Sequence, residues 1–174
     1  MSDYAHVLTL LDSSDPVPRD DVRRWIDAGE LQTWSAIYAL LARAADRIHP
    51  ALTQSESLEF TRRFLIRCIE ENPRPGEHLL GGYQAAWALA ARLKQWRKSP
   101  RSADVLRGIA IELERIYRRG DSATKNRILC GVLEHAFEEP ALRPYFASWD
   151  RDEELKEAYK LAVDWGVTHS EDEH

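Results

Sequence analysis

The fold is decided by residues 118–145, which read RRGDSATKNRILCGVLEHAFEEPALRPY. This stretch begins at the end of one helix, turns at Gly120 and Asp121, and continues into a strongly apolar helix. Glycine is common just past a helix end because it tolerates positive φ. Asp121 or Ser122 can accept hydrogen bonds from the free N–H groups of the next helix, and Pro140 ends that helix. We therefore predict two helices that lie nearly antiparallel across a short connection.

Apolar residues recur at three- and four-residue spacing along most of the chain, and no stretch alternates apolar and polar residues as a half-buried strand does. This pattern predicts an all-α protein of about seven to nine helices. We expect antiparallel helical hairpins, packed as a compact bundle or as a short HEAT-like α–α superhelix. The predicted hairpins span residues 30–71, 79–119 and 122–165.

Particular residues mark where helices begin and end. Thr53 with Glu56 fits a capping box at a helix start. Ser102 and Asp150 are expected to cap two later helices, and Gly166 is expected to end the last one.

Length and composition are those of an ordinary globular protein. The chain has 174 residues, of which 44% are hydrophobic and 30% charged. Residues 1–166 are therefore expected to form one helical domain, and residues 167–174 a charged C-terminal tail. No apolar run is long enough to span a membrane, and the first residues lack the basic start of a secretory signal. Cys68 and Cys130 lie in apolar helical patterns, which favours buried thiols in a reducing compartment. We expect a cytoplasmic protein with no membrane partner.

Charge is unevenly placed within the net charge of −5. Residues 92–127 carry eleven bases and four acids, whereas residues 128–174 carry twelve acids and four bases. Such asymmetry can steer a charged partner. It can equally let one helix of the fold pair with another, and both interpretations are open.

The sequence contains no recognisable motif for catalysis or for metal binding. Its histidines are dispersed and none is paired at i, i+4; they are His6, His49, His78, His135, His169 and His174. No HExxH, G-x-S-x-G or phosphate-binding glycine motif is found. His78 follows a Pro–Gly turn and is expected to face solvent. We predict no catalytic residue, no metal site and no cofactor.

Tryptophan is abundant, with six residues in the chain. Helical spacing places Trp87 with Tyr83 and Ala90 on one apolar stripe, and Ala86, Leu89, Leu93 and Trp96 on another. The alanines among them permit close approach of another helix. Most of the tryptophan rings are expected in the core. Trp96 and Trp149 lie at helix ends among charges, where an exposed edge is the alternative to core filling. Aromatic residues beside charged ones are typical of the side chains that dominate binding at protein interfaces.

Two glycines predict a close helix crossing. If the turn centres on Gly120 and Asp121, then Gly108 and Gly131 lie at nearly the same height on adjacent helices. We expect the two helix axes to approach closely there.

Four segments near the C-terminus carry a family resemblance: IYRRGD, ILCGVLEHAF, PALRPYFASW and AVDWG. Over about sixty C-terminal residues, the chain resembles a family of small bacterial helical proteins. Relatives of this kind are similar to immunity proteins of bacterial toxin systems. The resemblance implies a protein that binds and neutralises a toxin, and it assigns no catalytic residue.

Our leading hypothesis is a non-enzymatic protein-binding module, acting as an immunity protein that neutralises a bacterial toxin. Acidic residues of the C-terminal third, with one tryptophan, are predicted to cover a basic site on the partner. They are Glu138, Glu139, Trp149, Asp150, Asp152, Glu153, Glu154 and Glu157.

The alternative hypothesis is a nucleic-acid-binding helical repeat that uses the basic segment 92–127. Its phosphate-binding residues would be Arg92, Lys94, Arg97, Lys98, Arg101 and Lys125. Assembly into a homo-oligomer is a third interpretation.

Overall fold

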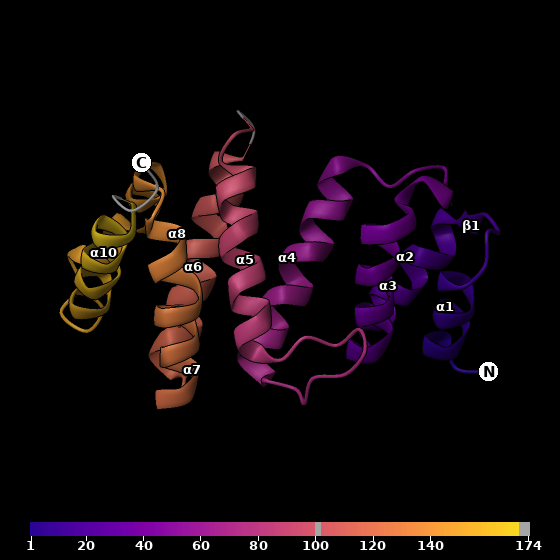
Figure 1. The fold of residues 1–174 in the computed structure, drawn as a ribbon, viewed down its shortest axis with the longest axis horizontal. Coiled ribbons are helices and arrows are strands. Elements are labelled where there is room, and N and C mark those ends of the chain that lie inside the picture. Colours follow the sequence, from indigo (N-terminus) through magenta and orange to yellow (C-terminus); the bar gives the residue numbers. More distant parts are fainter. Residues whose placement is uncertain (100–101, 171–174) are drawn as a thin grey trace. The chain divides into compact units, whose positions relative to one another are not determined.

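The computed structural model describes residues 1–99 and 102–170, and 76% of these residues lie in helices (Figure 1). The predicted all-α class is confirmed. Within the described residues, no helix combines the length and the apolar character that a membrane crossing requires.

Two compact units make up the chain. The first holds Met1–Phe64 and Pro73–Gly81, and the second holds Leu65–Asn72 and the chain from Gly82 onward. Helix α4 spans Gln54–Glu71; its residues up to Phe64 belong to the first unit and those from Leu65 onward belong to the second.

The first unit is helical except for one short parallel bridge. Its elements are α1 (Asp3–Leu11), β1 (Val17–Pro18), α2 (Arg19–Ala28), α3 (Leu31–Ala44), the 3₁₀ turn η1 (Ala45–Arg47), β2 (Ile48–His49) and the first part of α4. The bridge pairs Val17 with Ile48 and Pro18 with His49. Two residues in each strand are too few to show an alternating pattern, so the sequence does not predict this bridge.

Aromatic rings fill the core of the first unit between α3 and α4. Trp34 lies edge-on to Phe60 with ring centroids 5.9 Å apart, and the Tyr38 and Phe64 centroids are 4.9 Å apart. The indole N–H of Trp34 also donates to the Ile26 carbonyl at 3.0 Å. This bond ties α3 to the end of α2.

The predicted capping box at the start of α4 is confirmed. The Thr53 N–H donates to Glu56 at 2.8 Å, and the Glu56 N–H donates to the Thr53 hydroxyl at 3.2 Å. Arg23 of α2 forms an ion pair with Glu56 at 2.5 Å. The hydrogen bond from the Thr53 backbone, followed by that from Arg23, lowers the pKa of Glu56 to about 2.

The segment Pro73–Gly81 corrects one expectation about a histidine. The side chain of His78 is only 6% exposed, so the prediction that it faces solvent is wrong. The segment turns back on itself, with the Gly76 N–H donating to the Leu79 carbonyl at 3.0 Å. A Pro–Gly turn marks a change of chain direction, and it does not show which side chains that change encloses.

The second unit contains the apolar helix predicted after Gly120 and Asp121. After the end of α4, its elements are α5 (Gly82–Trp96), α6 (Ala103–Arg119), α7 (Ser122–Asn126), the π-helical segment η2 (Arg127–Leu133), α8 (Glu134–Phe137), the 3₁₀ segment η3 (Pro140–Phe146), α9 (Ala147–Asp150) and α10 (Lys156–Ser170). The predicted helix is thus continuous from α7 to α8, with a π-helical middle. Helix α8 packs against both α5 and α10 (Figure 1).

A buried arginine joins the end of α4 to the start of η2. Arg127 donates from Nε to the Ile69 carbonyl at 2.9 Å and from Nη2 to the Thr124 hydroxyl at 2.9 Å. A cation beside the last carbonyls of a helix interacts favourably with the helix dipole. A Cβ at Gly82 would overlap the Arg127 side chain, so the start of α5 can approach this arginine only with glycine there.

The turn that opens the helical run is partly as predicted. Asp121 accepts a hydrogen bond from the Thr124 N–H at 2.8 Å, which confirms it as the cap. Gly120, however, is extended, with φ −76° and ψ 154°, so the expectation of positive φ is wrong. A Cβ there would lie 2.8 Å from Cγ2 of Thr124 and 2.9 Å from the Ile116 carbonyl oxygen. Glycine is needed at this turn for space.

Of the two other predicted caps, Ser102 occupies the N-cap position of α6 but makes no capping bond with its side chain, and Asp150 is not a cap. Ser102 donates its hydroxyl to the Ser99 carbonyl at 2.6 Å and makes no side-chain bond to the N–H groups of α6. Before α10, the capping carboxylate is Asp152, which accepts from the Glu154 N–H at 2.9 Å. Asp150 is the last residue of α9, so its position in that helix precludes the predicted role.

The glycines mark close contacts other than the one predicted. A Cβ at Gly108 would meet nothing within 4 Å, so the predicted crossing of Gly108 and Gly131 is wrong. Gly131 lies against α5, where its Cβ would be 2.5 Å from that of Ala86. Gly166 does not end α10, which continues to Ser170. A glycine stands here because the Phe137 backbone packs on it. Residues 167–170 of the expected tail are therefore helical, and the rest of the tail lies outside the described residues.

Candidate functional site

The basic and acidic segments predicted from the sequence meet within the second unit. Lys94 of α5 pairs with Glu138 at 2.6 Å, and Arg97, which directly follows α5, pairs with Glu139 at 3.1 Å. Both acids follow α8. For these four residues, the uneven charge therefore serves pairing within the fold.

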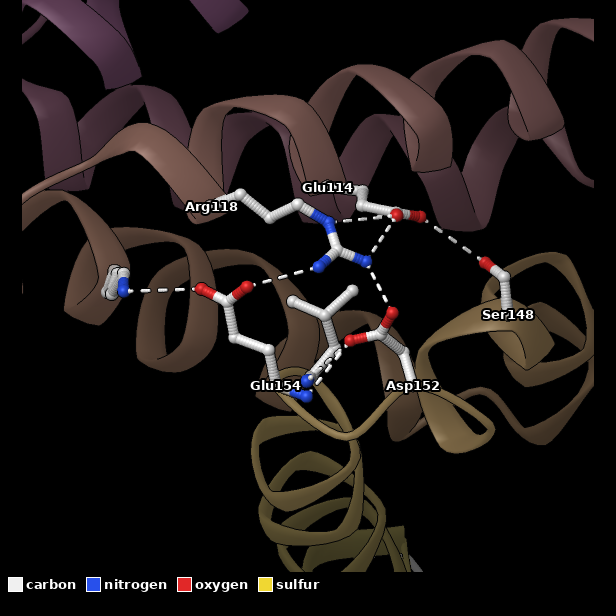
Figure 2. Close-up of polar contacts among 7 residues, drawn as sticks. Glu114, Arg118, Ser148, Asp152 and Glu154 are labelled. Carbon is white, nitrogen blue, oxygen red and sulfur yellow. Dashed lines mark hydrogen bonds and ion pairs between the residues drawn. The ribbon is translucent and has the colours of Figure 1, made fainter.

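A larger network joins α6 to the start of α10, and Arg118 is at its centre (Figure 2). Its guanidinium contacts Glu114 at 2.8 Å, Asp152 at 2.6 Å and Glu154 at 3.1 Å. Ser148 completes the network with a hydrogen bond to Glu114 at 3.5 Å. The bond from Arg118 lowers the pKa of Asp152, and bonds to Asp152 and Glu114 raise the pKa of Arg118. This network stabilises a packing arrangement and leaves few of its charges for a partner.

The remaining predicted acids lie between the end of α9 and the first turn of α10. Glu153 pairs with Lys156 at 2.5 Å. Asp150 and Glu157 line an open groove of about 590 Å³ together with Tyr159. Burial raises the pKa of Tyr159, and the charge of Asp150 adds to that effect.

The remaining predicted bases are dispersed. Arg92 donates to Gln95 at 3.0 Å, Lys125 lies 3.8 Å from Glu154, and Lys98 is exposed. Arg101 lies outside the described residues. Phosphates would have to displace carboxylates from Lys94, Arg97 and Lys125, and nucleic-acid binding stays a prediction.

The ring of Trp149 is fully buried, as core filling predicts, so the alternative of an exposed edge that contacts a partner is wrong. It packs against Tyr117 with centroids 5.3 Å apart and against Phe146 with centroids 6.2 Å apart. The chain after Pro140 folds back as η3 and α9, which buries this ring among other aromatic residues. Trp149 therefore belongs to the core of the second unit and is not part of its surface.

Other aromatic residues of the second unit are exposed instead. Trp87 is 52% exposed, Tyr83 is 42% exposed and Trp165 is 37% exposed. The sequence predicts two apolar stripes for α5, and the one with Tyr83 and Trp87 is exposed at these two rings. The core face of α5 is the smaller-residue stripe Ala85, Ala86, Leu89, Ala90 and Leu93. This run of alanines was the sequence signal for a close helix contact.

An open cavity of about 410 Å³ lies beside Trp87. Its lining residues are Trp87, Ala90, Ala91, Lys94, His135 and Glu138. The His135 ring is edge-on to Trp165 of α10 at 6.3 Å, and Trp165 stacks on His169 at 3.8 Å. We call this cavity and the rings of Tyr83 and Trp165 the aromatic groove. Helices α5 and α8 thus provide its lining, and α10 provides a ring beside it.

The aromatic groove combines apolar and polar groups. It offers apolar ring faces together with one carboxylate, one ammonium group and one imidazole. In residues 1–99 and 102–170, no three histidine, cysteine, aspartate or glutamate side chains are placed to hold a metal ion. Comparison with protein families, curated proteins and solved structures gave no match for this chain.

Proposed function

We propose that this chain is a non-enzymatic protein-binding module and that the aromatic groove is its contact surface. The observation that carries the proposal is the exposure of Trp87 beside an open cavity of about 410 Å³. Tryptophan and tyrosine are enriched among the residues that contribute most to protein–protein binding. A group of exposed large apolar side chains is typical of a surface that another molecule covers.

The charge layout supports this choice of surface. The carboxylates of Glu139, Asp152 and Glu154 already pair with bases of the same unit. Glu138 also pairs, with Lys94 at 2.6 Å, but it is partly exposed and lines the aromatic groove. The proposed contact surface therefore still contains an acidic residue, as the sequence predicts, but it is centred on Glu138 and Trp87.

We further propose that the partner is a bacterial protein toxin and that the two proteins meet in the cytoplasm. This identification of the partner rests on the resemblance of about sixty C-terminal residues to a family whose members are similar to toxin-immunity proteins. Its test is co-expression with the product of the neighbouring gene. That product alone is expected to stop cell growth, the wild-type chain to restore growth, and Trp87→Ala to lose the protection.

The contact surface itself is tested by comparing two exposed apolar residues. Trp87 lines the groove, whereas Ile111 of α6 is 67% exposed and is not among the lining residues. Tagged wild type, Trp87→Ala and Ile111→Ala are used to capture the neighbouring gene product. We expect capture by wild type and by Ile111→Ala, and loss of capture by Trp87→Ala.

Equal capture by all three proteins would contradict the proposed surface. Ile111→Ala is expected to change the free energy of unfolding by about 0.5 kcal/mol or less. Trp87→Ala is expected to lower it more, because about half of this larger side chain is covered. Circular dichroism melting of each variant checks that a loss of capture is not a loss of fold.

A further inference from the structure

We infer that the aromatic groove takes a basic side chain, an arginine presented by the protein partner. The inference rests on the proposed function and names the chemistry by which the partner is recognised. It follows from the Glu138 carboxylate, the cation that this carboxylate already holds, and the rings around it.

The Glu138 carboxylate can accept more hydrogen bonds than it has. One oxygen accepts from Lys94 at 2.6 Å, and the other lies 3.1 Å from Nδ1 of His135. An ionised carboxylate has about four acceptor sites, so these contacts leave capacity for a further donor. Both members of the Lys94–Glu138 pair are partly exposed, and an incoming group can therefore reach them from solvent.

The ammonium group of Lys94 shows that the Glu138 carboxylate binds a cation. This ammonium group can be displaced by an incoming cation. The ammonium group of lysine is a point charge on a flexible four-carbon stem, whereas a guanidinium is planar and can bind both oxygens of a carboxylate. When an arginine arrives, the Lys94 ammonium can turn into water and remain hydrated. Lys94 is then an internal competitor of the partner.

The rings distinguish a cationic ligand from an anionic one. Trp87 offers an exposed ring beside Glu138, and the Tyr83 and Trp87 centroids are 6.2 Å apart. The face of an indole attracts cations and not anions. An incoming anion would also meet the carboxylate of Glu138, whose pKa lies below its ordinary value. Partial burial opposes ionisation of Glu138, and the bonds to Lys94 and His135 outweigh it.

A pair of matched peptides tests the inference. One is acetyl-Gly-Arg-Gly-amide and the other replaces arginine with citrulline, which has nearly the same shape and no charge. Each is titrated into the ¹⁵N-labelled chain while the indole N–H signals are followed by NMR. We expect the arginine peptide to shift the Trp87 signal in a saturable way at millimolar concentration. The citrulline peptide is expected to leave it unchanged, and both peptides to leave buried Trp25 unchanged.

Two variants separate a cation site from an anion site. Glu138→Gln is expected to weaken binding of the arginine peptide by about tenfold, because a charge-assisted hydrogen bond is lost. Lys94→Met is expected to strengthen it by about threefold or more, because the internal competitor is gone. A merely structural role for Lys94 predicts no such gain.

Three results would overturn the inference: no shift with the arginine peptide, an equal shift with citrulline, or weaker binding by Lys94→Met. A glutamate peptide that shifts Trp87 in wild type and fails to do so in Lys94→Met would show an anion site instead. The proposed function is tested separately, because capture by wild type and its loss in Trp87→Ala do not depend on the charge of the bound side chain.

Discussion

Gly166 shows at the scale of one residue how α10 packs on the end of α8. A Cβ at this position would overlap the carbonyl group of Phe137 and lie 2.9 Å from the Glu138 nitrogen. The Phe137 carbonyl also accepts hydrogen bonds from Arg143 at 3.1 and 2.8 Å, which hold it in place. The clash would therefore be with backbone that cannot move freely. Glycine in the interior of a helix normally costs stability, and here it allows close packing.

The first prediction compares Gly166 with Gly108, which lies in α6 with nothing near the position of its missing Cβ. Gly166→Ala is expected to lower the free energy of unfolding by about 1–3 kcal/mol through overpacking. Gly108→Ala is expected to raise it by about 0.5–1 kcal/mol, because the unfolded chain loses freedom and the helix gains alanine. Urea denaturation followed by circular dichroism measures both. A stabilising Gly166→Ala would contradict the packing.

The exposed position of Trp87 could not be read from the sequence. The stripe of Tyr83, Trp87 and Ala90 and the stripe of Ala86 and Leu89 both repeat at helical spacing. Spacing shows which residues share a face of α5, but it does not show which face is covered. The side with alanines is buried because it lets the π-helical segment approach, with Gly131 packed on Ala86. The larger rings stay outside.

At the scale of one element, the start of α4 has an electrostatic consequence. Glu56 accepts hydrogen bonds from the Thr53 N–H and from Arg23, and its pKa falls from its ordinary value of 4.5 to about 2. A carboxylate with a lowered pKa stabilises the folded state fully above its unfolded pKa. This contribution is lost as pH falls through the folded pKa.

The second prediction follows from this pKa. Glu56→Gln is expected to lower stability relative to wild type near neutral pH, and the difference is expected to shrink as pH falls from about 5 toward 2. The reason is that wild-type Glu56 becomes neutral over this range, as glutamine always is. Denaturant titrations at a series of pH values measure the difference. A difference that does not change with pH would contradict the ionised capping box.

The tie between α6 and the start of α10 also belongs to this scale. Arg118 holds three carboxylates at once, on its own helix and across from it (Figure 2). Single exposed ion pairs contribute little to stability, whereas networks of several charges can contribute more. Arg107 provides the comparison, because it pairs only locally with the highly exposed Asp104 at 2.8 Å.

The third prediction uses these two arginines. Arg118→Met is expected to lower the midpoint of thermal unfolding more than Arg107→Met does, because methionine keeps part of the stem and removes the network. The difference is expected to decrease in high salt, which screens partly exposed charges. Differential scanning calorimetry at low and high salt measures it. Equal midpoints for the two variants would mean that the network is not stabilising.

How well the helix ends could be predicted depends on how local their signals are. Thr53 with Glu56, and Asp121 with the following helix, are contacts between near neighbours and are confirmed. Asp150 and Asp152 are both suitable caps, and the choice between them depends on where α9 ends. The bridge of β1 and β2 depends on contacts between distant residues, which no local pattern contains.

At the scale of the whole molecule, several charges of the basic segment 92–127 pair with charges of the acidic segment 128–174 within the second unit. The basic segment and the acidic segment contact each other through Lys94, Arg97 and Arg118. The sequence left open whether this asymmetry served a partner or the fold, because a charge count does not show which charges meet. For these pairs it serves the fold. The aromatic groove lies beside one of these ion pairs, that of Lys94 and Glu138.

The most direct measurement on the aromatic groove is site-specific photo-crosslinking in cells that also make the neighbouring gene product. A photoreactive benzophenone side chain replaces Ala91, which lines the groove, or Ile111, which is exposed and does not line it. The groove predicts a covalent adduct with a single protein from position 91 and none from position 111. An adduct from position 111 and none from position 91 would contradict the groove as the binding surface.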